Sequence, residues 1–378
     1  TGSSGGLIYT AGSAGAVIQV GAVTSDYTGG TTLTSGTIVM NGTNNGDTST
    51  AGTFGNGSVA SNVVTLNGAS IRGGTTTATR TIFNNISFTA DTTLAATSGG
   101  ATGTLTWAGE VTLNGTGSVR KLTQASATQD TVFSNTIKNG TVSDFTVDFT
   151  GSRSVSLGAA NTFSGTMLVT GTGGGGLALA HVNALQNATL DTGSATASRA
   201  VTFTAAGTNT YNIGALQGAD DLAIGANTLS VGAKAVDTSF SGAISGTGGL
   251  TKVGSNKLTL TGTNSYSGNT SVQGGELVVN GTIAASTTTT IGNGATISGS
   301  GSVGNLTVDS GGSVNPGNSP GTLTVNGNYS QAGTLVAEIT GLTAGTQHDQ
   351  LIVNGTVSLS GSLNAQFSAG SYQLNDMI

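Results

Sequence analysis

Residues 241–281 read SGAISGTGGLTKVGSNKLTLTGTNSYSGNTSVQGGELVVNG. Two runs of β-branched and aliphatic residues, Lys257–Thr261 and Glu276–Asn280, are separated by Gly, Asn and Ser. Short runs bounded by such residues are typical of strands and turns. The pattern recurs along the whole chain, for example at Thr81–Phe88 and Leu351–Leu359. We therefore expect an all-β protein.

A longer pattern repeats as well. Residues 159–179, AANTFSGTMLVTGTGGGGLAL, match residues 262–279, GTNSYSGNTSVQGGELVV. Both contain Asn, an aromatic residue, Ser-Gly, a Thr-bearing strand, a Gly pair and a second aliphatic strand. A unit of several short strands cannot bury its own apolar face, whereas stacked coils share one core. The repeat predicts a β-solenoid with about 20 to 25 residues per coil.

The composition supports this fold class and excludes others. Gly accounts for 64 of 378 residues and Pro for 2, which is too little of both for collagen. Charged residues make up 7% of the chain, far below the ~25% of an ordinary domain, so coiled coils and helical bundles are excluded. We expect small aliphatic residues inside, Gly and Asn at corners, and hydroxyl and amide groups outside. The ten Phe, six Tyr and single Trp, Trp107, are expected in the core.

The charge distribution is acidic. The net charge is −6 and the chain has ten Lys and Arg residues, which argues against nucleic acid as a partner. No basic residue follows Lys257, whereas five acidic residues do. We interpret the excess negative charge as a source of solubility through repulsion.

The absence of Cys excludes disulfides, thiolate zinc sites and a cysteine nucleophile. No run of about 18 apolar residues is present that could span a bilayer as a helix. The sequence starts at Thr1 without a signal-like segment. We expect a processed or excised part of a larger exported protein.

At this point the residues carry a resemblance to a family. Residues 241–281 resemble the passenger-associated transport repeat of bacterial autotransporter adhesins. Residues 313–339, SVNPGNSPGTLTVNGNYSQAGTLVAEI, resemble the segment that ends many such passengers, and LIVNGTVSLSGSLNAQF at 351–367 continues it. The resemblance is specific over 239–378, partial over 131–238 and mainly compositional over 1–130. We expect these three parts to form one continuous solenoid.

The resemblance implies a right-handed parallel β-helix, exported through the outer membrane as the passenger of a type V secretion system. It places the protein outside the cell or on the bacterial outer-membrane surface. It implies an outer-membrane barrel downstream, beyond Ile378. The expected partners are a host, abiotic or neighbouring-cell surface, or further copies of the chain, and not nucleic acid. No cofactor is expected.

Several short motifs suggest chemistry, but each has a structural explanation. The phosphate-binding pattern GxGxxG occurs at 171–176 and 299–304, which is about what chance predicts for this Gly content. Asp191-Thr192-Gly193 and Asp309-Ser310-Gly311 copy the aspartic-protease phrase, and we expect both to be turns. The nucleophile pattern GxSxG occurs at 2–6 and at 317–321. In the second, Pro320 follows the serine and lacks the N–H that an oxyanion hole needs.

The candidate acids and bases are few. His181 and His348 are the two imidazole groups, and neither belongs to a triad or metal phrase. The closest acid pairs, Asp144 with Asp148 and Asp220 with Asp221, could in principle cut glycans or bind calcium. We expect a structural role for them, and no catalytic, cofactor or metal site.

Three functions therefore stand in order. The first is an extracellular structural and adhesive rod that acts in surface attachment or cell–cell contact. The second is a filament or surface-layer subunit, because solenoid ends carry unpaired edges that invite stacking. The third is a β-helix enzyme acting on polysaccharide.

Overall fold

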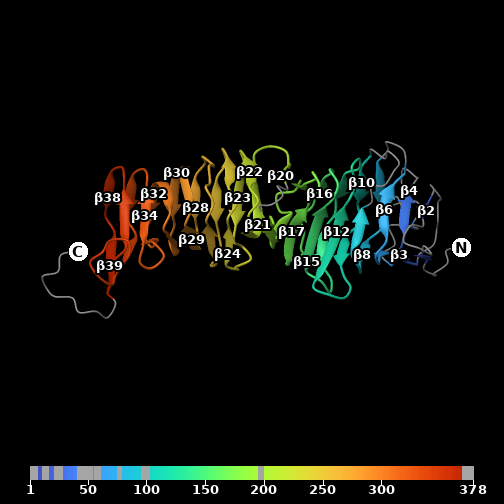
Figure 1. Ribbon diagram of the computed structural model, residues 1–378, viewed down its shortest axis with the longest axis horizontal. Helices are drawn as coiled ribbons and strands as arrows, with labels where there is room; N and C mark the ends of the chain where they lie inside the picture. Colours follow the sequence, from blue (N-terminus) through green and yellow to red (C-terminus); the bar gives the residue numbers. More distant parts are fainter. Residues whose placement is uncertain are drawn as a thin grey trace. The chain divides into compact units, whose positions relative to one another are not determined.

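The computed structural model describes residues 7–10, 17–20, 29–40, 54, 61–74, 79–94, 103–194 and 200–367. These residues form 39 β-strands and no helix (Figure 1). The chain divides into two compact units, Thr1–Ala205 and Ala206–Ile378. Every ladder between named strands within the units is parallel, so each unit is a parallel β-helix, as predicted. No helix in the described part of the chain is long and apolar enough to cross a membrane.

The first unit has three parallel sheets, one on each face of the helix. The first sheet contains β1 (Leu7–Thr10), β3 (Thr31–Ser35), β5 (Val64–Leu66), β8 (Ile86–Phe88), β11 (Val111–Leu113) and β14 (Ile137–Asn139). The second contains β7 (Arg80–Ile82), β10 (Leu105–Trp107), β13 (Thr131–Phe133), β16 (Val155–Leu157), β18 (Leu177–Leu179) and β20 (Val201–Phe203). The third contains β2 (Val17–Val20), β4 (Thr37–Met40), β6 (Ser70–Gly73), β9 (Thr92–Leu94), β12 (Val119–Gln124), β15 (Asp144–Phe149), β17 (Thr166–Gly171) and β19 (Leu185–Asp191).

The second unit is built in the same way. One long ladder starts with β21 (Thr210–Gln217), β23 (Thr228–Val231), β26 (Leu250–Lys252), β28 (Thr270–Val272), β30 (Thr282–Ile291) and β32 (Ser302–Val308). It then divides into β34 (Thr322–Val325) with β37 (Gln350–Val353), and β35 (Tyr329–Gln331) with β38 (Val357–Leu359). A short sheet pairs β22 (Leu222–Gly225) with β25 (Ile244–Gly246).

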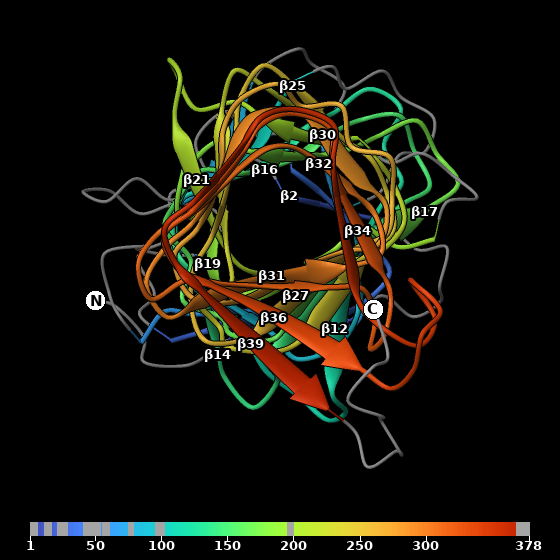
Figure 2. The same cartoon turned by 90° about the vertical axis from the view of Figure 1, so that its left-hand side faces the viewer.

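The remaining sheet of the second unit positions the candidate site. It contains β24 (Thr238–Phe240), β27 (Lys257–Leu260), β29 (Gly275–Val279), β31 (Ala295–Gly299), β33 (Ser313–Pro316), β36 (Thr334–Ile339) and β39 (Ser362–Phe367). We call it the groove sheet. Figure 2 shows β27, β31, β36 and β39 on one side of this unit, with β30, β32 and β34 on other sides.

The register gives the coil length. In the first unit Leu105 lies opposite both Arg80 and Thr131, so one coil takes about 25 residues. In the second unit Leu258 lies opposite Thr238 and Leu277, so one coil takes about 20 residues. Both values agree with the coil length predicted from the repeat.

Side chains alternate between the interior and the outside along each strand, as the pleat requires. In β11, for example, Val111 and Leu113 are fully buried and Thr112 between them is half-buried. The interior of the first unit also holds a cluster of aromatic rings from successive coils. Neighbouring centroids in it lie 5.6 to 6.5 Å apart, and its members are Phe88, Trp107, Phe133, Phe145 and Phe163. Close packing of these rings fixes the coils against one another.

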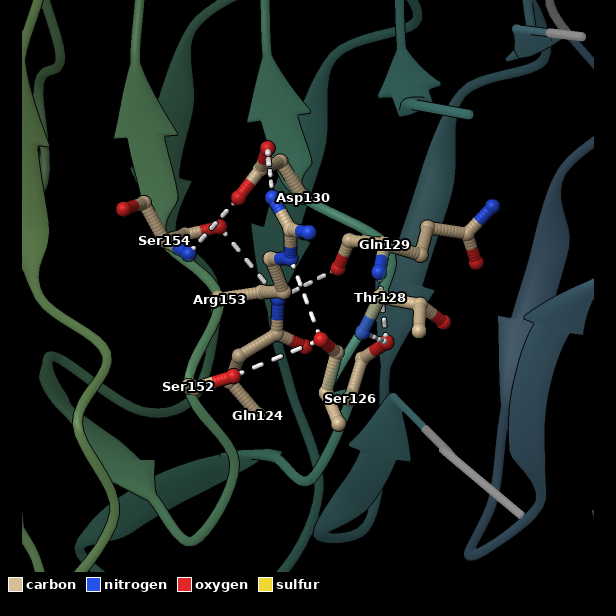
Figure 3. Close-up of polar contacts among 9 residues, drawn as sticks. Gln124, Ser126, Thr128, Gln129, Asp130, Ser152, Arg153 and Ser154 are labelled. Carbon is tan, nitrogen blue, oxygen red and sulfur yellow. Dashed lines mark hydrogen bonds and ion pairs between the residues drawn. The ribbon is translucent and has the colours of Figure 1, made fainter. Parts of the chain in front are cut away.

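Asp and Asn side chains join adjacent coils at the corners. The Asp130 Oδ1 atom accepts the backbone N–H of Ser154 from the next coil at 2.9 Å (Figure 3). Beside it, the Arg153 Nε–H donates to the carbonyl of Ala127 at 3.2 Å, and the guanidinium lies 3.8 Å from Asp130. The same contact recurs where a side-chain oxygen accepts a backbone N–H across about one coil, at Asp91, Asn85, Asp144, Asp221, Asp237, Asn264, Asn305 and Asn328. Most of the chain's sparse acidic groups therefore have a structural task.

Candidate binding groove

The structure places the predicted glycine and aspartate motifs in turns. Gly171 has a φ of 122°, and a Cβ there would lie 2.2 Å from the Phe149 carbonyl of the preceding coil. The Asp191 Oδ1 atom accepts the N–H of Gly193 at 2.8 Å, which is an Asx turn. The Asp309 carbonyl accepts the N–H of Gly312 at 2.9 Å. The GxSxG at 2–6 lies outside the described residues.

The predicted imidazole groups also bond locally. The His181 Nδ1 atom accepts the N–H of Asn183 at 3.0 Å, and His348 Nδ1 lies 3.1 Å from the Gly341 carbonyl oxygen. Neither contact involves a serine or a carboxylate.

The acid pairs contact neighbouring coils. Asp144 accepts the N–H of Thr166 at 2.7 Å, and Asp148 lies 3.4 Å from the Lys121 ammonium. Asp221 accepts the N–H of Ala243 at 2.7 Å, and its neighbour Asp220 is buried. Among the residues that the structure describes, no three His, Asp or Glu side chains gather as metal ligands would.

One hollow on the outer wall of the second unit has the properties of a binding site. It is a groove of about 350 Å³ over the groove sheet, which is at the lower end of volumes found for small-ligand sites. Its floor is a single column of outward-facing side chains, one from each of four successive coils. The members of this floor column lie opposite one another in register: Thr259, Val278, Ser298 and Asn315.

An ion pair forms one side of the groove. Lys257 and Glu276 are opposite each other on β27 and β29, and their charged atoms are 3.0 Å apart. The Ser298 hydroxyl donates to the Glu276 carboxylate at 2.5 Å. The carboxylate is therefore held in place by two neighbours, and the pair adds no net charge.

The loop 317–321 forms the other side. The Asn318 Nδ2–H₂ group donates to Asn280 Oδ1 at 2.9 Å and lies 3.2 Å from Ser300 Oγ, so one side chain joins three coils. Ser319 has a φ of 72°, which non-glycine residues rarely adopt, and its hydroxyl donates to the Glu338 carboxylate. The loop is thus fixed at both of these residues.

A second loop supports the first from behind. Asp349 accepts two backbone N–H groups, from Gly321 and Glu338, each at 2.9 Å. It belongs to the insertion 340–349 between β36 and β37, which the preceding coils of this unit lack. Together the two loops close the groove on the side away from the ion pair.

The arrangement is suited to binding by hydrogen bonds. The lining presents hydroxyl and amide groups, one ion pair and the single apolar side chain of Val278. Glu276 is the one carboxylate among the lining residues. By register, the nearby Glu338 is three strand steps and four residues away from it, which places the two roughly 20 Å apart. A glycosidase needs its two carboxylates within about 5 to 9.5 Å.

Comparisons with known proteins agree with the fold. The family model of the passenger-associated transport repeat matches residues 21–40 and 250–279. An adhesin BmaC autotransporter from Brucella suis is 32% identical over 166 residues, covering 39% of this chain and 5% of the adhesin. An extracellular serine protease from Serratia marcescens is 47% identical over 87 residues, covering 23% of this chain and 8% of the protease. No solved structure matches.

The parallel β-helix, its hydroxyl and amide surface and the matched repeats define a class, the β-helical proteins that bacteria place outside the cell. Within that class, the chain belongs to the autotransporter passengers and lies outside the cell or on the outer-membrane surface. It spans about a twentieth of the adhesin's length and less than a tenth of the protease's.

Proposed function

We propose that this passenger acts in attachment to a surface or to neighbouring cells, and that the groove is a point of contact. The similarity to an adhesin supports the attachment role. The observation that carries the proposal is the floor column, which aligns side chains from four coils between an ion pair and a fixed loop. Such preorganised polar groups bind with little further ordering.

Contact rather than catalysis is the function that the groove supports. Its single carboxylate is paired with Lys257 and has no second carboxylate within reach. The hydroxyl of Ser319 donates to Glu338, whereas a serine nucleophile needs a base such as His. The similar serine protease shares only 8% of its length with this chain, so its activity is not carried over.

Self-association is a second candidate, in the form of a filament or surface layer. Several apolar side chains are exposed on β38 and β39, with 53 to 66% of their surface accessible: Val357, Leu359, Leu363 and Phe367. Apolar side chains grouped on one coil favour contact with another apolar surface. Sedimentation velocity over a range of concentrations would detect assembly. The division into parts 1–130, 131–238 and 239–378 of one solenoid belongs to the same proposal.

An adhesion assay with groove variants tests the attachment role. Asn280→Ala combined with Asn318→Ala removes the amide contact that holds the loop and two polar groups of the groove. We expect beads coated with this variant to attach about tenfold less to the surface that the unaltered protein binds, because two or more hydrogen bonds are lost. Attachment is measured by counting retained beads under flow.

Thr307→Ala is the matched control, because Thr307 faces outward on β32 of the same unit, away from the groove. It should attach normally, and all three proteins should have the same circular dichroism. Equal attachment by the groove variant and the control would exclude the groove as the contact point.

A further inference from the structure

We infer that the groove binds an uncharged, extended saccharide chain that lies along the floor column, across the strands. This inference rests on the proposed function and names the class of ligand for the same site. Three properties of the groove lead to it: its repeat distance, its charge and its lack of apolar surface.

The repeat distance comes from the register. Thr259, Val278, Ser298 and Asn315 are direct neighbours in a parallel ladder, so one outward side chain recurs every ~4.8 Å along the stacking direction. An extended β-linked polysaccharide advances by a similar length with each sugar ring. Successive rings can therefore meet equivalent positions on successive coils. The two flanks keep such a chain aligned with the column.

The chemistry of the lining fits sugar hydroxyl groups. Asn280, Asn315 and Asn318 each offer both donors and acceptors, and Ser298 and Ser319 offer hydroxyls. A sugar hydroxyl is also both donor and acceptor, so these groups pair without a charge on the ligand. Glu276 can accept further bonds through its remaining lone pairs, because its carboxylate is held by Lys257 and Ser298.

The charge argues against an anionic ligand. Lys257 is the only cation in the lining and is already paired with Glu276. No Lys or Arg follows it in the sequence, whereas Glu276, Asp309, Glu338 and Asp349 lie in the coils beyond. A sulfated glycan would meet this negative charge without compensation.

The lack of apolar surface argues against a polypeptide partner. Protein interfaces gain most of their binding energy from buried aromatic and aliphatic anchors. The lining contains no aromatic residue, and its one aliphatic side chain, Val278, is only 6% exposed. A saccharide bound mainly by hydrogen bonds does not need such an anchor.

Isothermal titration calorimetry with defined probes tests the inference. The neutral probes are cello-, manno- and chito-oligosaccharides of increasing length; heparin fragments and gelatin represent polyanions and extended polypeptides. We expect at least one neutral series to bind, with affinity that rises with chain length until the four coils of the floor are covered. Asn315→Ala and Asn318→Ala should each weaken binding about five- to tenfold, and Thr307→Ala should not.

The outcomes separate this inference from the proposed function. If attachment of beads depends on Asn318 but no neutral series binds, the saccharide inference is wrong and the attachment role stands. Tighter binding of heparin or gelatin than of every neutral series would also overturn it. If a neutral series binds and attachment does not depend on the groove, the attachment role fails while the ligand class holds.

Discussion

Replacing Trp107 by Ala is expected to lower the free energy of unfolding of the first unit by about 3 to 5 kcal/mol. Trp107 is fully buried, and its ring lies 5.7 Å from that of Phe88 and 5.6 Å from that of Phe133, on other coils. Truncation leaves a cavity between coils that the stacked backbone cannot close. Because the variant lacks the chain's only Trp, unfolding in denaturant is followed by far-ultraviolet circular dichroism.

Trp107→Phe is the matched control. It keeps an aromatic ring in the cluster and removes the indole N–H, which has no hydrogen-bond partner in the structure. We expect it to cost at least 2 kcal/mol less than the Ala variant, on the order of the cavity that the ring fills. Equal and small losses for both variants would show that the aromatic cluster does not hold the coils together.

Lys252→Met is expected to cost the second unit about 3 kcal/mol. Lys252 is fully buried, and its ammonium group donates to four oxygens at 2.7 to 3.3 Å, which belong to Val253, Gly254, Asn256 and Gly274. Since Gly274 is on the following coil, the group joins two coils. A Met side chain fills similar space but leaves these oxygens without a donor. The free energy of unfolding is measured in denaturant at pH 7.

Lys257→Met serves as the control, because its ion pair with Glu276 is partly exposed and is worth at most about 1 kcal/mol. The pH dependence gives a second test. Burial lowers the pKa of Lys252 from 10.5 to about 8, opposed by the charge of Asp237. The folded chain therefore loses this proton before the unfolded chain does, and stability should rise as the pH goes from about 8 to 10.5. Lys252→Met should lack that rise.

The sequence pattern predicted the fold class well, because short runs such as that ending at Leu113 alternate as strands do. It did not predict where strands break. The expected strand Thr81–Phe88 is two strands, β7 and β8, since Asn84 turns inward and donates to the carbonyls of Phe54 and Asn62 at 3.2 and 3.1 Å. Similarly, Leu351–Leu359 is divided by the turn at Asn354-Gly355. Both breaks depend on tertiary contacts or on corners that composition does not locate.

The groove was not predicted from the sequence. Its loop 317–321 was noticed only as a failed GxSxG motif, and its residues Asn280 and Asn318 are 38 positions apart. Bringing them together requires the register of three coils, and the coil length varies between neighbours. A shift of one residue would turn the floor column inward. The insertion 340–349 could have been found as a departure from the spacing of the preceding coils.

The register of the floor column is the claim on which the groove and its ligand depend, and engineered cysteines test it directly. The chain has no Cys, so a pair introduced at Ser298 and Asn315 can react only with itself. These neighbours on adjacent strands lie within the ~4.4 to 6.8 Å Cα separation that a disulfide needs. Ser298→Cys with Asn315→Cys should form an intramolecular disulfide under mild oxidation, seen by mass spectrometry. Val278→Cys with Asn315→Cys, two coils apart, should not, and a disulfide in the second pair but not the first would contradict the register.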